Sequence, residues 1–193
     1  MGKIKVGMLL QPGRSFCGEI YPVDIGLPNI IDKLNGRKWH QITEPDIKSK
    51  VTPLNVDTHK YQQGKVLILA GSVGMTGAAY LSTMGALRSG VGLTITCTPS
   101  SLNEIYEQKI SEGMTLLCED KGRGYFSKDN YDVIMEHVDW CDAFIIGPGL
   151  GKYDEALQLV NKLVRNVDKP MVIDADGLRI FYNNAKLFKE INP

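Results

Sequence analysis

Three short apolar segments, each followed directly by a turn of glycines or aspartates, constrain the fold of this chain more than any other feature. The segments with their turns occupy residues 65–80, 143–151 and 171–178. Each is typical of a β-strand that ends in a turn and leads into a helix, and repeated strand–helix alternation predicts an α/β fold with a parallel sheet. Ligands of such sheets bind outside the carboxyl ends of the strands. We therefore expect the three turns to lie on one rim, around one site.

The hydrophobic pattern extends this prediction to a three-layer sheet with helices on both faces. We expect strands at 65–70, 93–98, 143–146 and 171–173, and helices at 78–89, after Ser101, at 128–139, up to 165, and at 177–189. Alternating residues in 93–98 indicate one less buried face. Gly85, inside a predicted helix, indicates close backbone packing. The polar stretch 119–124 is expected on the surface.

The N-terminal residues have a different pattern. Residues 1–28 predict two short strands, at 5–10 and 19–26, the second an edge strand because Pro22 cannot donate to a ladder. Two short strands do not form an independent domain, so we interpret this piece as the tail of something larger. Residues 29–58 are interpreted as a linker, in which Thr43 is expected to cap a short helix with Pro45 in its first turn.

Charge and composition give no sign of several classes of partner and site. The 193 residues include 22 lysines and arginines and 22 aspartates and glutamates, so a net charge near zero gives no reason to expect nucleic acid or a membrane surface. No stretch approaches the roughly 18 apolar residues of a membrane span, and the residues before Gln11 are too few for a signal peptide. Four cysteines and three histidines are scattered. We therefore expect neither a metal site nor a disulfide framework, and a cytoplasmic location.

The first turn carries glycines at 71, 74 and 77. This Gly-x-x-Gly-x-x-Gly spacing differs from the dinucleotide fingerprint Gly-x-Gly-x-x-Gly. Glycines let backbone N–H groups approach a ligand, and a following helix N-terminus favours an anion. The turn therefore predicts a cradle for a phosphate or another polar group, or else simply a tight turn before a helix of small residues.

The other two turns offer different chemistry. Gly147-Pro-Gly-Leu-Gly151 is rigid and has few side chains, which suits a flat ligand lying on the backbone or a connector that needs positive φ. Asp174 and Asp176 follow the third strand. They are interpreted either as carboxylates that bind magnesium, a hydroxyl or a base, or, for Asp174, as the cap of a loop. Lys60, just before the first strand, is interpreted either as a cation on the rim or as a solvated side chain.

Five segments in order then resemble a known family: His59–Ser72, Gly74–Ala79, Gly85–Leu93, Gly147–Gly151 and Val172–Leu178. They resemble the ADP- or ATP-dependent NAD(P)H-hydrate dehydratases, which are ribokinase-like repair enzymes. Three N-terminal segments, Gly7–Ser15, Gly18–Ile20 and Val23–Pro28, resemble the closing strands of the NAD(P)H-hydrate epimerase domain that precedes the dehydratase in bifunctional members. The resemblance divides the chain into an epimerase tail at 1–28, a linker at 29–58 and the N-terminal half of a dehydratase domain at 59–193.

The resemblance implies repair of hydrated NADH and NADPH. The hydrate hydroxyl is phosphorylated from ADP or ATP and phosphate leaves, while the epimerase interconverts the two hydrate epimers. The implied ligands are the hydrated cofactor, an adenine nucleotide, Mg²⁺, and potassium in the epimerase part, in a parent that is a homo-oligomer. The residues expected to bind substrate are Gly147, Gly149, Ala78 and Ala79, and those expected to bind the nucleotide are Asp174, Asp176 and Lys60.

Some family motifs do not occur in this sequence. A Pro-His-Pro-Gly-Glu segment, a lysine-containing strand and a Gly-Thr-Gly-Asp motif, whose aspartate is the expected base, would lie beyond Pro193. The epimerase's catalytic residues would lie before Met1. We therefore assign no catalytic residue here, and expect a ribokinase-like sheet truncated at its C-terminus that carries neither complete activity.

Three other functions are weighed against this one. A nicotinamide-dependent dehydrogenase is disfavoured because the glycine spacing differs and no acidic residue ends the strand at 93–98. A ribokinase-type small-molecule kinase would share the fold. A non-catalytic nucleotide-binding module would retain binding without turnover.

Overall fold

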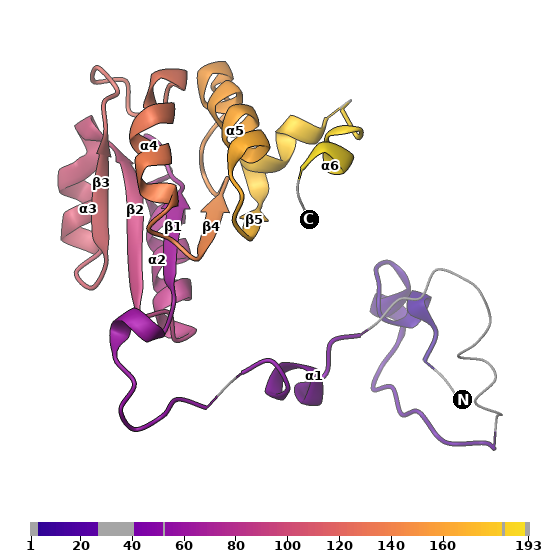
Figure 1. Cartoon of the computed structure of the whole chain (residues 1–193). Coiled ribbons are helices and arrows are strands. Elements are labelled where there is room, and N and C mark those ends of the chain that lie inside the picture. Colours follow the sequence, from indigo (N-terminus) through magenta and orange to yellow (C-terminus); the bar gives the residue numbers. More distant parts are fainter. Residues whose placement is uncertain (1–3, 27–40, 52, 183, 192–193) are drawn as a thin grey trace. The chain divides into compact units, whose positions relative to one another are not determined.

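The chain divides into two compact units, Met1–Leu54 and Asn55–Pro193. The structure, a computed structural model, describes residues 4–26, 41–51, 53–182 and 184–191 (Figure 1).

The first unit contains short helical turns in its described residues. They are the 3₁₀ helices Val6–Met8 and Gly13–Phe16 and the helix α1, Glu44–Lys48. The strands predicted at 5–10 and 19–26 are wrong, because the described part of 1–28 holds no strand. Backbone N–H groups there bond locally instead, as Met8 does to the carbonyl of Lys5 at 2.9 Å. A strand needs a partner strand for those groups, and a local turn does not.

The capping prediction for α1 is confirmed. Thr43 is its N-cap residue and Pro45 lies in the first turn. The Asp46 carboxylate accepts a hydrogen bond from the Thr43 N–H at 2.7 Å, which is the reciprocal contact of a capping box.

The second unit is built on a five-stranded parallel sheet in the order β3-β2-β1-β4-β5 (Figure 1). Its strands are β1 Lys65–Leu69, β2 Leu93–Pro99, β3 Met114–Cys118, β4 Ala143–Ile146 and β5 Met171–Ile173. Its main helices are α2 Thr76–Arg88, α3 Asn103–Lys109, α4 Tyr131–Val138 and α5 Asp154–Asn166. A 3₁₀ segment Ala175–Phe181 and the short α6, Leu187–Glu190, follow β5, in place of the single helix predicted at 177–189.

Helices cover both faces of the sheet, which confirms the three-layer α/β prediction. Alternate residues of β1 point to opposite faces, so Leu67 and Leu69 pack in one core and Val66 and Ile68 in another. The first core includes α4 and α5 side chains such as Leu163. The second includes residues of α2 and α3.

The less buried face predicted for the strand at 93–98 is wrong. Thr94, Thr96 and Thr98 of β2 are buried beneath α2 and α3. The Thr96 hydroxyl lies 2.7 Å from that of Thr83 on α2. A buried hydroxyl is usually hydrogen-bonded, as those of Thr96 and Thr98 are, whereas the Thr94 hydroxyl has no partner among the described residues. The polar alternation therefore marked a helix-covered face rather than a solvent face.

One strand was not predicted, and one smaller prediction is wrong. The chain forms β3 at 114–118, which was not foreseen. A Cβ at Gly85 would meet nothing within 4 Å, so this glycine marks no close approach among the described residues.

No helix in the described part of the chain is long and apolar enough to cross a membrane.

Gly147 provides a test of how closely the turns pack. Its φ is +124° and an added Cβ would lie 2.0 Å from the backbone oxygen of Asp174. Gly64 is the matched control, because its φ is +85° but a Cβ there meets nothing within 4 Å. We expect Gly64→Ala to lower the free energy of unfolding by about 1 kcal/mol through backbone strain. Gly147→Ala should lower it by about 3 kcal/mol or more, because the clash adds to the strain. Urea unfolding measures both, and equal losses would contradict the close approach.

Candidate functional site

The first two turns are joined directly at the carboxyl ends of β1 and β4. The Gly71 N–H donates to the carbonyl of Pro148 at 2.7 Å. The Ser72 hydroxyl donates to the carbonyl of Gly149 at 2.9 Å. Parallel pairing of β1 with β4 brings these ends together, and the prediction that the turns share one rim is confirmed for this pair.

The third turn is fastened to the second. The Gly151 N–H donates to the Asp176 carboxylate at 2.9 Å, and an Arg179 N–H approaches the Gly151 carbonyl at 3.4 Å. The Asp174 N–H donates to the carbonyl of Ile146 at 3.0 Å. All three turns therefore form one continuous rim.

Gly149 lies against the first turn of α2. Its φ is +66°, and an added Cβ would come within 2.7 Å of the Ala78 Cβ. The predicted substrate residues Gly149 and Ala78 are thus neighbours. Ala79 is different, because its side chain has no exposed surface and packs in the core beneath α2. Its methyl group therefore does not line the rim.

Gly147 is also buried, and the structure gives it a packing role. Its lack of a side chain lets the second turn approach the backbone of the third, at Asp174 and Gly177. The ligand contact predicted for Gly147 stays a prediction.

The two aspartates have different environments. Asp174 is exposed directly after β5, whereas Asp176 is half-buried and accepts the Gly151 N–H. Asp174 therefore presents its carboxylate to solvent, and Asp176 fixes the neighbouring turn. No group of three or more His, Cys, Asp or Glu side chains among the described residues is arranged to hold a metal ion.

Of the two interpretations of Lys60, the cation on the rim is wrong, and the solvated side chain agrees with its exposure. Lys60 begins the 3₁₀ turn that precedes β1, and its carbonyl packs against Gly92, which precedes β2. These positions are at the amino ends of the strands, on the edge opposite the three turns. A residue that enters a parallel strand cannot share the rim where that strand ends.

Sequence reasoning missed a buried carboxylate at the same rim. Asp120 follows β3 and has no exposed surface. It accepts hydrogen bonds from the hydroxyls of Ser100 and Ser101 and from the backbone N–H groups of Ser101, Gly122 and Gly124. Burial alone would raise the pKa of the Asp120 carboxyl, but these hydrogen bonds lower the pKa to about 2. The stretch 119–124, predicted as surface, is thus organised around a buried charge.

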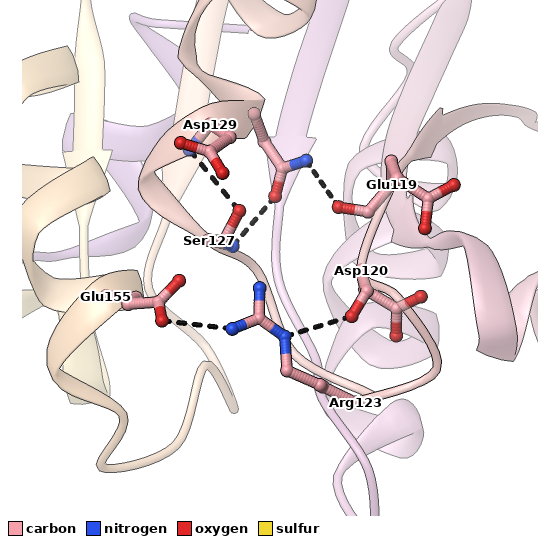
Figure 2. A network of polar contacts seen from close by, with 7 residues as sticks. Glu119, Asp120, Arg123, Ser127, Asp129 and Glu155 are labelled. Carbon is pink, nitrogen blue, oxygen red and sulfur yellow. Dashed lines mark hydrogen bonds and ion pairs between the residues drawn. The ribbon is translucent and has the colours of Figure 1, made fainter.

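The loop at residues 119–130, called the Asp120 loop below, contacts both the first turn and α5. The Val73 N–H donates to the carbonyl of Gly124 at 2.6 Å. Figure 2 shows the Arg123 guanidinium between the Asp120 carbonyl and the Glu155 carboxylate, each at 3.0 Å. Glycines two and four residues after an aspartate that ends a strand are the one sequence signal for such a loop, because their N–H groups can turn back to the carboxylate.

The other end of this loop is a second polar network. Figure 2 shows Ser127 and Asp129 in contact at the start of the turn before α4. The Asn130 amide accepts from the Ser127 N–H at 2.8 Å and donates to the Glu119 carbonyl at 2.9 Å. The loop is therefore tied at both ends, so its position over the first turn is fixed.

Comparison with known proteins identifies the family. The family model described as NAD(P)H-hydrate dehydratase matches residues 66–192. The chain belongs to the NAD(P)H-hydrate dehydratase family. The match begins at the first residues of β1 and runs through all three turns.

Several curated relatives are similar over nearly the whole chain. The bifunctional NAD(P)H-hydrate repair enzyme Nnr of Moorella thermoacetica is 31% identical over 183 residues, which is 95% of this chain and 34% of that protein. The corresponding enzyme of Dictyoglomus turgidum is 33% identical over 177 residues, 90% of this chain and 34% of that protein. The chain thus spans about a third of the length of these relatives.

Solved structures agree with the fold. The ADP/ATP-dependent NAD(P)H-hydrate dehydratase of Bacillus subtilis, co-crystallised with ATP and Mg²⁺, matches with a TM-score of 0.55 and 27% identity, covering 70% of this chain and 46% of that one. A ribokinase-like superfamily protein of Enterococcus faecalis matches with a TM-score of 0.61, covering 78% of this chain and 52% of that one. At 22% identity this second match shows the fold alone.

The Asp120 carboxylate predicts a pH-dependent contribution to stability. The pKa of the Asp120 carboxyl in the folded state is about 2, below its ordinary value of 3.8. The carboxylate therefore contributes stability that is present above pH 4 and is lost as the pH falls toward 2. We expect Asp120→Asn to lower the free energy of unfolding by about 2 kcal/mol near neutral pH. The difference from the wild type should shrink between pH 4 and pH 2.

Urea unfolding across this pH range measures the effect, with Glu136→Gln as control because Glu136 is an exposed carboxylate on α4. A loss for Asp120→Asn that stays constant with pH would show that the carboxylate is not the titrating group.

Proposed function

We propose that this chain provides part of the active site of an enzyme that dehydrates hydrated NADH and NADPH at the expense of ADP or ATP. The observation that carries the proposal is the joined rim, in which Gly149 lies against the start of α2 and is fixed from the first turn by Ser72. Family membership and the similarity to the Bacillus subtilis dehydratase that was co-crystallised with ATP and Mg²⁺ support it. They also favour dehydration over hydride transfer.

In this proposal the chain binds and orients the ligands. The side-chain-free surface of Gly149 and the adjacent Ala78 receive the hydrated ring. The rigid backbone hydrogen bonds hold that surface in place, so little ordering accompanies binding. Because the sequence contains no Gly-Thr-Gly-Asp motif, we assign no catalytic base to the described residues.

Asp174 is the residue that fits a nucleotide-bound Mg²⁺. Mg²⁺ prefers oxygen ligands and is commonly held by one or two carboxylates together with substrate phosphates. An exposed carboxylate at the carboxyl end of β5 meets that requirement. When bound, the ion would neutralise phosphate charge during transfer.

We also infer that residues 1–28 are the tail of a preceding epimerase domain and that residues 29–58 are the linker that follows it. The relatives match up to 95% of the chain, whereas the family model begins at residue 66, so their similarity extends through the N-terminal residues. These relatives are described as bifunctional repair enzymes. A potassium ion in the epimerase part, a homo-oligomeric parent and a cytoplasmic location are further predictions of the same proposal.

The decisive experiment is an assay of the protein expressed from its complete gene. NADH hydrate is supplied with ADP, with ATP or with neither, and recovery of NADH is followed by its absorbance. We expect recovery only with a nucleotide. Absence of recovery with both ADP and ATP would overturn the proposal.

Gly149→Ala links the activity to the rim. The added methyl group would lie 2.7 Å from Ala78 and displace the second turn from α2. We expect a loss of roughly ten-fold or more in kcat/KM, because small displacements of bound groups are costly in catalysis. Gly64→Ala, at the opposite edge with open space around its Cβ, should leave kcat/KM unchanged. Equal rates for both variants would place the chemistry elsewhere.

A further inference from the structure

A pocket of about 400 Å³ lies beside the second turn. Its lining residues are Met75, Gly151, Lys152, Tyr153 and Asp176. They come from all three turns of the rim, so the pocket adjoins the candidate site and none of its side chains except Asp176 was predicted to bind a ligand.

Gly151 sets the apolar lining of this pocket. A Cβ at Gly151 would lie 2.6 Å from Cε2 of Tyr153 and 3.3 Å from Cε of Met75. The ring and the thioether therefore approach the same point, which they can reach only because residue 151 is glycine. An aromatic ring and a methionine together suit a flat, polarisable ligand group.

The Tyr153 ring is held in place from behind. It stacks on Tyr125 with ring centroids 3.9 Å apart and planes 5° apart. The Arg123 guanidinium lies 5.0 Å from the Tyr125 ring centroid and is itself paired with Glu155. An aromatic ring fixed before binding loses little conformational entropy when a ligand packs on it.

The polar part of the pocket carries one cation close to the ring. Lys152 is exposed, and the described residues show no acidic partner for it. Asp176 and Arg179 hold the N–H and carbonyl of Gly151, so the backbone between the ring and the rim is fixed. A stacking surface with an adjacent ammonium group is the chemistry that recognises a planar base bearing phosphate.

We propose that this pocket binds the base of a phosphorylated nucleotide, with the ring against Tyr153 and Met75 and a phosphate at Lys152. This proposal rests on the proposed function, because the two candidate ligands are the nucleotide and the cofactor of that reaction. The adenine nucleotide and the dinucleotide cofactor share the chemistry, and the experiment separates them.

Binding is measured by titration calorimetry on the full chain, with ATP–Mg²⁺ in one arm and NADPH, the unhydrated form of the cofactor, in the other. We expect Tyr153→Ala to weaken binding in at least one arm by about ten-fold or more, through lost stacking. Tyr153→Phe should bind as the wild type does. Lys152→Gln should weaken the same arm and reduce its salt dependence.

Arg88→Gln is the control, because Arg88 is an exposed cation in the last turn of α2, at the opposite edge of the sheet. The arm that weakens identifies the occupant. Binding that changes by about two-fold or less in both arms for Tyr153→Ala and Lys152→Gln overturns the proposal, as does a wild-type chain that binds neither nucleotide. Calorimetry measures binding without turnover. A chain that binds nucleotide through Tyr153 but shows no dehydratase activity would therefore contradict the proposed function and not the proposed pocket.

Discussion

The site depends on backbone hydrogen bonds between the turns that end two neighbouring strands. Gly71 donates to Pro148, and the Gly147 N–H donates to the carbonyl of Leu69 at 3.0 Å. Both glycines have positive φ, which turns the chain sharply without moving the strand ends apart. The shape of the rim is consequently set by main-chain hydrogen bonds more than by contacts between side chains.

The sheet beneath the rim holds these strand ends in register. β1 is paired on both sides, with β2 and β4, and its residues have helices over both faces. Burial on both faces gives the strand no freedom to slip, because a one-residue shift would exchange its two cores. The turns inherit that rigidity, so a ligand would meet a surface that needs little rearrangement.

Much of this arrangement could be predicted from the sequence. The strands at 143–146 and 171–173 form as expected, because short apolar runs bounded by glycine, proline and aspartate leave few alternatives. The strand β3 was missed although four of its five residues, Met114–Cys118, are apolar, because periodicity alone does not tell a short apolar run in a strand from one in a helix.

The errors at the site have physical causes as well. Ala79 was assigned to the cleft by its place in a motif, but its helical phase turns its methyl group toward the core, and the ligand contact predicted for it stays a prediction. Lys60 was placed by its proximity in sequence, although strand direction puts it at the opposite edge. Asp120 was hidden because a buried carboxylate and a solvated one look alike in a polar stretch, and only the tertiary contacts distinguish them.

The Asp120 loop has a consequence for what the rim can recognise. Backbone N–H groups that converge on one point form a nest that ordinarily captures a phosphate. Here the protein's own carboxylate already occupies the nest, with two hydroxyls completing its coordination. An incoming anion therefore finds these N–H groups already bonded and is repelled by the charge that they hold, so a phosphate of the proposed nucleotide would have to bind elsewhere on the rim.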